Sequence, residues 1–150
     1  MIDLAAIEAW PLAAAIRHSV WAYPLLETIH IAAFAVLFGS LMLLELRVFG
    51  MRRTVPLVPL AGLAVPTALV AFVIAATAGL LMLISSATEI VPNTAFQVKL
   101  GLILIVGLNA LWFHRRGSLE LHDGVAKAQA LLSLLLWTGV ILAGRLIAYV

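Results

Sequence analysis

Long apolar stretches, separated by short polar breaks, set the pattern of this chain. A transmembrane helix needs roughly 20 mostly apolar residues, and four stretches reach that length. We expect helices at residues 23–48, 64–87, 95–115 and 126–148. The second is placed near Pro66 because proline is tolerated in the first turn of a helix. The pattern predicts an all-α integral membrane protein, with four transmembrane helices in an up-down bundle that forms a single domain over residues 1–150.

The polar breaks contain residues that begin and end helices. Thr94 and Gln97 have the spacing of a capping box that opens the third helix. Gly117 follows the third apolar stretch, as glycine does at many helix ends. Asp123 precedes the fourth stretch and is expected to cap it.

Residues 3–18 precede the first span and lack the pattern of a cleaved signal. Asp3 and Glu8 come first, with no basic region before an apolar run. Trp10 and Arg17 interrupt the segment well short of a membrane span. We expect a short interfacial helix here, with aromatic side chains at the level of the lipid headgroups.

Composition narrows the class of protein further. Apolar residues make up 65% of the chain and charged residues 11%, whereas soluble domains average about 45–50% and about 25%. The lipid bilayer is therefore the main expected partner. The net charge of +2 is too small and too scattered for a nucleic-acid surface. Because cysteine is absent, disulfides, thiolate metal sites, iron–sulfur clusters and covalently attached haem are excluded.

Basic residues predict the orientation in the membrane, since short cytoplasmic loops are enriched in Lys and Arg. The loops after the first and third helices hold six of them: Arg47, Arg52, Arg53, Arg115, Arg116 and Lys127. The opposite side holds Arg17, Lys99 and Arg145. We expect a bacterial cytoplasmic (inner) membrane protein with both termini outside.

Small residues at four-residue spacing indicate where the helices approach one another closely. The ridges are Ala71, Ala75 and Gly79 on the second helix, Ala35 and Gly39 on the first, and Gly139 and Ala143 on the fourth. Chance spacing in alanine-rich helices is the alternative explanation.

Between Tyr23 and Leu46, the ionisable residues of the first span are Glu27, His30 and Glu45. Glu27 and Glu45 are about five turns apart and share one helix face, with His30 about 60° away. Charge exposed to lipid is costly, so we expect this stripe to face the interior of the bundle. Because Arg47 and Arg52 follow closely, Glu45 is interpreted as part of an ion pair at the membrane boundary.

Three interpretations of His30 remain open. It can be an axial ligand of haem b or of another metal, a proton-relay or quinone-binding group tuned by Glu27, or a structural hydrogen-bonding residue. A bis-histidine haem needs a second histidine at similar depth, and His18, His114 and His122 all lie nearer the ends of the helices. Met82 is the candidate for a His/Met pair.

Two further polar residues are candidate cofactor-binding residues. Lys99 is either the charge partner of Glu27 or a cation that extends to the headgroups. Asn109, deep in the third helix, is interpreted as an interhelical hydrogen-bonding residue, with ligand contact as the alternative. The chain has no Gly-rich phosphate loop, no Ser or Cys nucleophile motif and no HExxH, so we predict no catalytic activity of its own.

Two stretches carry a family resemblance, PLLETIHIAAFAVLFGSLMLLELRVFG and NTAFQVKLGLILIVGLNALWFHRR. The arrangement resembles a bacterial family of small four-helix membrane proteins of unknown function. More distantly it is similar to copper-resistance D-type membrane domains and transmembrane b-type cytochromes. The resemblance implies functional positions at Glu27, His30, Arg47, Phe96, Lys99 and Asn109, and a link to haem b.

Taken together, these features favour a small non-enzymatic membrane protein. We expect a subunit or accessory factor of a redox or metal-handling system, with a membrane or periplasmic protein partner or a second copy of the chain. The alternatives are a b-type haem electron-transfer protein that uses His30, and a module that transports protons or metal ions.

Overall fold

The computed structural model describes residues 3–121 and 123–150, and every described element is a helix. Four helices are long: α3 (Ala22–Val48), α4 (Leu57–Ser85), α6 (Thr94–Arg116) and α8 (Gly124–Leu146). The others are short: α1 (Leu4–Glu8), α2 (Pro11–His18), α5 (Ala87–Ile90) and α7 (Ser118–Leu121). The expected all-α class is confirmed.

The four long helices are apolar enough to cross a membrane by length and composition. Their mean hydropathies are 2.1, 2.5, 1.7 and 1.7 in chain order. Large side chains such as Leu63, Leu104 and Leu135 are more than 60% exposed. Because soluble proteins rarely expose so much contiguous apolar surface to water, this outer surface is suited to contact with lipid.

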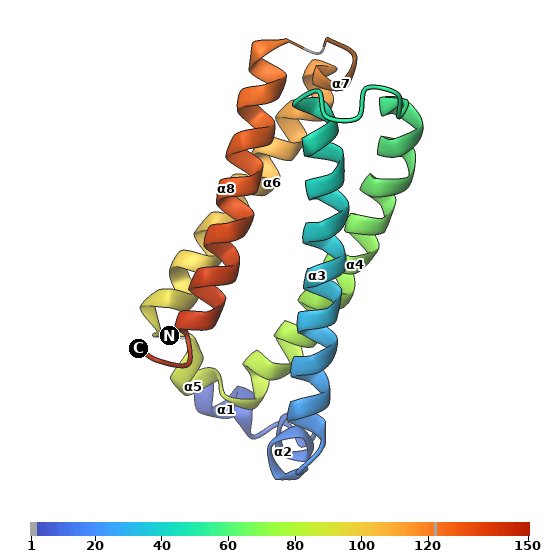
Figure 1. The fold of residues 1–150 in the computed structure, drawn as a ribbon. Helices are drawn as coiled ribbons and strands as arrows, with labels where there is room; N and C mark the ends of the chain where they lie inside the picture. The colour runs from blue at the N-terminus through green and yellow to red at the C-terminus, as the bar shows by residue number, and fades with distance from the viewer. Residues whose placement is uncertain (1–2, 122) are drawn as a thin grey trace.

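The long helices are arranged as two closely packed pairs (Figure 1). α3 packs along α4, and α6 packs along α8. A smaller contact between α3 and α8 joins the pairs, and the Trp137 indole of α8 takes part in it. The Trp137 ring is 5.5 Å from the Phe34 ring of α3 and 6.4 Å from the Phe72 ring of α4, both in edge-on geometry.

Alanines on α4 explain why the first pair is so close. Six of them are buried at spacings of three or four residues, namely Ala61, Ala64, Ala68, Ala71, Ala75 and Ala78. Such a row lets the backbones of two helices approach, so the expected ridge through Ala71 and Ala75 is confirmed. On α3 the prediction of Ala35 and Gly39 is wrong: Ala35 is exposed and nothing lies within 4 Å of a Cβ built on Gly39. Ala33 and Leu37 are the buried residues instead.

Two helix boundaries differ from the prediction. α4 begins at Leu57 rather than near residue 64, and Pro66 lies inside the helix. Pro56 stands just before the first residue of α4, so the prolines early in this apolar stretch do not delay the start of the helix to residue 64. The predicted single interfacial helix over residues 3–18 is two short helices, because the chain turns at Trp10 and Pro11 begins a new first turn.

The caps follow the sequence pattern with one correction. Asn93, not Thr94, caps α6, and its Oδ1 atom accepts a hydrogen bond from the Phe96 amide at 3.1 Å. Asp123 caps α8 as expected, accepting from the Ala126 amide at 2.9 Å. Gly117 ends α6 in the left-handed conformation at φ 68°, which glycine adopts without a steric penalty.

Candidate functional site

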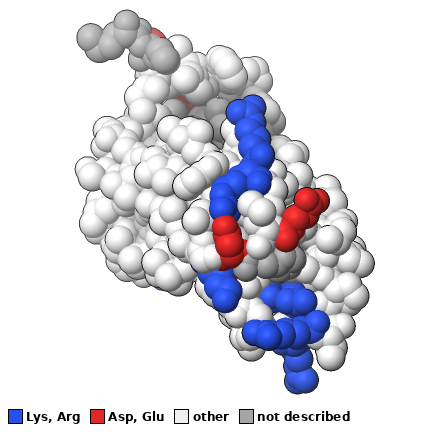
Figure 2. Space-filling model, turned by 90° about the horizontal axis from the view of Figure 1, so that it is seen from above, with Lys and Arg blue, Asp and Glu red and all other residues white. Residues whose placement is uncertain are grey.

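The two ends of the molecule differ in charge. The α3–α4 loop and the connection from α6 to α8 lie at one end, and both chain termini lie at the other (Figure 1). Viewed onto the first end, Lys and Arg side chains gather on the surface with acidic groups among them (Figure 2). Here Arg47 does not pair with Glu45: its guanidinium donates hydrogen bonds to the loop carbonyls of Val55, at 2.7 Å, and Arg53, at 3.3 Å. Arg47 therefore holds the loop together.

At the opposite end, α1 and α2 are attached to the α4–α5 junction by Glu8 and Arg17. The Glu8 carboxylate accepts hydrogen bonds from both the amide and the hydroxyl of Thr88, each at 2.7 Å. Arg17 donates to the Ser85 carbonyl oxygen at 3.1 Å and to the Glu8 carbonyl oxygen at 3.0 Å. Hydrogen bonds from Thr88, together with the positive charge of Arg17, hold the pKa of Glu8 below its usual value.

His30 lies between α3 and α4. Its Nδ1 atom is 2.7 Å from the Ala75 carbonyl oxygen. A carbonyl can only accept, so Nδ1 carries the proton and Nε2 has the free lone pair. The ring covers Gly79, where an added Cβ would come within 3.2 Å of His30 Cε1. The structure thus places His30 as a link between two helices.

The other predicted partners of His30 are not gathered around it. Glu27 is exposed, and in the described residues it forms no ion pair with Lys99. Lys99 is half-buried against α8, with its Nζ 3.3 Å from the position of a Cβ on Gly144. Met82 lies about one turn beyond Gly79 on α4 and is half-buried. The predicted Glu27–Lys99 pair is therefore not formed.

The described histidines do not fit a bis-histidine haem. His18 ends α2, and His114 lies in the last turn of α6 at the basic end, where its Nδ1 is 2.8 Å from the Ala110 carbonyl oxygen. His122 lies outside the described residues. Among residues 3–121 and 123–150, no group of three or more His, Cys, Asp or Glu side chains is placed to hold a metal ion.

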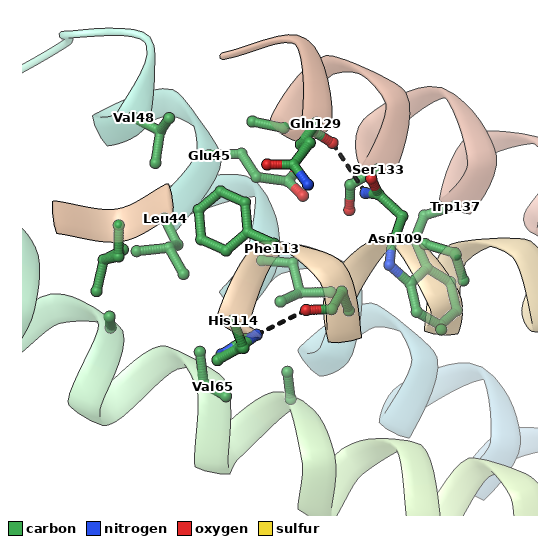
Figure 3. A pocket seen from close by; sticks show the side chains of 18 of the residues that line it. Leu44, Glu45, Val48, Val65, Asn109, Phe113, His114, Gln129, Ser133 and Trp137 are labelled. Atoms are coloured by element: carbon green, nitrogen blue, oxygen red, sulfur yellow. Dashed lines mark hydrogen bonds between the residues drawn. The ribbon is translucent and has the colours of Figure 1, made fainter. Parts of the chain in front are cut away.

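A cavity of about 490 Å³ lies between the two helix pairs, toward the basic end (Figure 3). Most of its wall is apolar, formed by side chains such as Leu41, Val65 and Ile103, and three aromatic rings contribute: Phe72, Phe113 and Trp137. The polar side chains in the wall are Glu45, Asn109, His114, Glu120, Gln129 and Ser133. Its size and lining are typical of small-molecule sites, which span about 300–1,000 Å³ and combine apolar walls with a few polar groups.

Glu45 is the acidic group that the four long helices contribute to this wall. Its side chain is only 7% exposed and interacts with the Ser133 hydroxyl of α8. Glu45 and Glu27 share a face of α3, but α8 covers that face at the level of Glu45 and leaves it open at Glu27. The interpretation of Glu45 as part of a boundary ion pair is wrong, because α8 packs over it and Arg47 is engaged in the loop.

Asn109 and Gln129 form the polar contact between α6 and α8 beside Glu45. The side-chain amide nitrogen of Asn109 donates to the backbone carbonyl oxygen of Gln129 at 3.0 Å. The Ser118 hydroxyl lies 2.7 Å from Gln129 Oε1 and also accepts from Arg116 at 3.2 Å, so Ser118 donates to Gln129. The predicted role of Asn109 in interhelical hydrogen bonding matches this geometry.

This hydrogen-bonded chain is anchored at the start of α8. The Asp123 carboxylate pairs with the guanidinium of Arg116 while it caps α8. Hydrogen bonds from Arg116 and from the Ala126 amide, together with the guanidinium charge, keep the pKa of Asp123 well below its usual range. The orientation of Gln129 thus depends on side chains at the end of α6 and at the start of α8.

Three side-chain atoms at this point are buried without a hydrogen-bond partner: Glu45 Oε2, Asn109 Oδ1 and Gln129 Nε2. A buried polar atom without a partner costs about 1–3 kcal/mol, and such groups in a native structure call for an explanation. They come from α3, α6 and α8, and their side chains border one cavity (Figure 3). These three residues, together with Ser133, which interacts with Glu45, form the polar cluster of the cavity.

Sequence reasoning included only Asn109 of this cluster among the candidate site residues. Gln129 and Ser133 interrupt the fourth apolar stretch at positions four residues apart, which puts them on one helix face. A comparison of the depth of every polar residue in each span would have grouped them with Glu45 and Asn109.

Comparison of the whole chain with protein-family models, with curated proteins and with solved structures finds no match.

Proposed function

We propose that this chain is a non-enzymatic membrane protein that binds a lipophilic small molecule in the cavity beside Glu45. One observation carries the proposal: three helices place polar atoms without partners at the wall of a cavity of about 490 Å³. A bound molecule that has an apolar body and a hydrogen-bonding group satisfies both parts of this lining. That the chain serves a redox or metal-handling system stays a prediction.

The proposed setting is a four-helix up-down bundle with both termini outside and the basic end in the cytoplasm. The gathering of Arg and Lys at one end of the molecule supports this orientation. α1 and α2 are proposed to lie at the outer membrane–water interface. Exposed Trp10, Leu12, Val20 and Trp21 support that position, since aromatic residues are enriched at headgroup level.

The route to the cavity is proposed to lead from the lipid between α4 and α6. These two helices are not one of the packed pairs. The exposed residues of the cavity wall lie mainly along them, namely Leu69 on α4 and Gly107, Ala110 and His114 on α6. A molecule dissolved in the bilayer can therefore reach the cavity without passing through water.

Tryptophan fluorescence in lipid nanodiscs tests the proposal. Trp137 borders the cavity and is 7% exposed, whereas Trp112 on the outer face of α6 is 56% exposed. Two single-tryptophan proteins are made by replacing the other three tryptophans with Phe, and a dibrominated long-chain alcohol serves as a neutral quencher. We expect saturable quenching of Trp137, and quenching of Trp112 that only follows the quencher content of the bilayer.

The matched variant is Ala110→Phe, which places a ring in the wall of the cavity. It should abolish the saturable quenching of Trp137 and leave the quenching of Trp112 unchanged. If the Trp137 signal follows bilayer content as Trp112 does, or is unaffected by Ala110→Phe, the proposed function is wrong.

A further inference from the structure

We propose that the ligand of this cavity is a lipophilic organic cation that binds in exchange for a proton on Glu45. The inference rests on the proposed function and specifies its ligand: a molecule that has an apolar, preferably aromatic, body and an ammonium or phosphonium centre. The first observation is the position of Glu45, which places a carboxyl group at an apolar cavity with no cation beside it.

The elements that border the cavity present few ionisable side chains to Glu45. α8 presents Ser133 and Gln129, α6 presents Asn109 and His114, and α7 presents the carboxylate of Glu120. The part of α4 that borders the cavity is entirely apolar. The guanidinium of Arg47 is bonded to loop carbonyls and that of Arg116 to Asp123. Within residues 3–121 and 123–150, Glu45 forms no ion pair.

An ionised carboxylate in such surroundings is costly unless a positive charge compensates it. The free protein meets this requirement with a proton on the carboxyl group. A bound organic cation meets it in another way, because the carboxylate then becomes its counter-ion. The exchange balances: one proton leaves Glu45 for each singly charged cation that binds, and no bond other than O–H is broken.

The aromatic rings supply the second part of a cation site. Phe72, Phe113 and Trp137 border the same cavity from α4, α6 and α8. Aromatic faces attract cations, and enclosures of aromatic side chains recognise quaternary ammonium groups. The remaining apolar wall matches a hydrophobic body, so the lining suits an organic cation and not a hydrated inorganic one.

A metal ion is disfavoured by the same geometry. Metal ions such as Zn²⁺, Ca²⁺ and Mg²⁺ need several oxygen or nitrogen ligands, and in the described part of the chain no cluster of His, Asp or Glu provides them. The approach between α4 and α6 is through lipid, which a hydrophobic cation can enter and a hydrated metal ion cannot.

A pair of ions of the same shape and opposite charge provides the test. Tetraphenylphosphonium and tetraphenylborate are added separately to the Trp137-only protein in zwitterionic nanodiscs that contain the dibrominated alcohol. We expect the phosphonium to displace the quencher and restore Trp137 fluorescence, and the borate to have no effect. The affinity for the phosphonium should rise by about tenfold per pH unit over the pH range in which the free protein holds a proton on Glu45. One proton should be released per ion bound.

Four variants assign the proton. Glu45→Gln should reduce phosphonium affinity at least tenfold and remove its pH dependence, and Glu45→Asp should keep the pH dependence with weaker binding. Glu27→Gln, on the exposed part of the same helix, is the matched control and should change neither. Because His114 also borders the cavity, His114→Ala is included and should leave the pH dependence in place.

The results separate this inference from the proposed function. If the alcohol quenches Trp137 but the phosphonium does not displace it, or if the borate displaces it equally well, the cavity binds lipophilic molecules and the cation inference is wrong. If the pH dependence disappears in His114→Ala and survives in a folded Glu45→Gln, the exchanged proton is not held by Glu45 and the inference is overturned. If the alcohol itself fails to quench, the proposed function is the part that fails.

Discussion

The Nδ1 nitrogen of His30 on α3 lies 2.7 Å from the carbonyl oxygen of Ala75 on α4. The ring also covers Gly79, one turn further along α4. A polar side chain in a long apolar helix thus connects the two most closely packed helices. Metal-bound histidines commonly donate their second N–H to a backbone carbonyl, and this contact likewise leaves Nε2 available. In the described residues, however, no group of three or more His, Cys, Asp or Glu side chains is placed to hold a metal ion.

Replacement of His30 by Ala should lower stability modestly. Interhelical hydrogen bonds in membrane proteins contribute about 0.6 kcal/mol on average and up to about 1.7 kcal/mol, so a loss of about 1 kcal/mol is expected, including lost packing on Gly79. The measurement is reversible unfolding in mixed detergent micelles. His18→Ala, at an exposed position at the end of α2, should be neutral; an equal loss in both variants would contradict the structural role of His30.

Gly79→Ala and Gly62→Ala should have opposite outcomes although both lie in α4. Nothing lies within 4 Å of a Cβ on Gly62, whereas a Cβ on Gly79 meets the His30 ring at 3.2 Å. Alanine favours a helix over glycine by up to about 1 kcal/mol, so Gly62→Ala should stabilise the protein and Gly79→Ala should not.

A double-mutant cycle identifies the cause of that difference. In the His30→Ala background the imidazole is gone, so Gly79→Ala should become as favourable as Gly62→Ala. A Gly79→Ala penalty that persists without the ring would place the close contact elsewhere.

Asp123 should make stability depend on pH in acid. Its pKa in the folded protein is lowered by Arg116 and the Ala126 amide, so its contribution is fully present above the ordinary aspartate pKa of about 4. The contribution is lost as the pH falls from there toward the lower pKa of the folded state. Asp123→Asn should therefore be less stable than the wild type at pH 7, with a difference that shrinks below about pH 4. A difference independent of pH would show that the ion pair contributes nothing.

Glu8 should control whether the N-terminal segment stays attached. Glu8→Ala removes both hydrogen bonds from Thr88 and also the carboxylate that pairs with Arg17. We expect faster hydrogen exchange over α1 and α2, and unchanged exchange in the core of α4. Because the pKa of Glu8 is also lowered in the folded protein, wild-type protein should show the same faster exchange as the pH falls below the ordinary glutamate pKa of about 4.3. Asp3→Ala, whose carboxylate only caps α1, is the control and should leave α2 protected.

The candidate site could be predicted only in part. Asn109 was recognisable because an amide in an apolar span needs a partner, but its partner Gln129 is 20 residues away on another helix. Glu45 was misassigned because sequence proximity to Arg47 suggested an ion pair, whereas the distance along a chain says little about which helix lies opposite.

The sequence by itself determined the four apolar spans, the caps at Asp123 and Gly117, and the gathering of arginines at one end. These are local properties: span length follows from bilayer thickness, and capping follows from the needs of each helix end. Tertiary structure alone decided that α3 pairs with α4 and α6 with α8. That pairing placed His30 against Ala75, and left room between the pairs for the cavity at Glu45. Helix pairing depends on how whole surfaces of side chains fit together, and one span read alone does not contain that information.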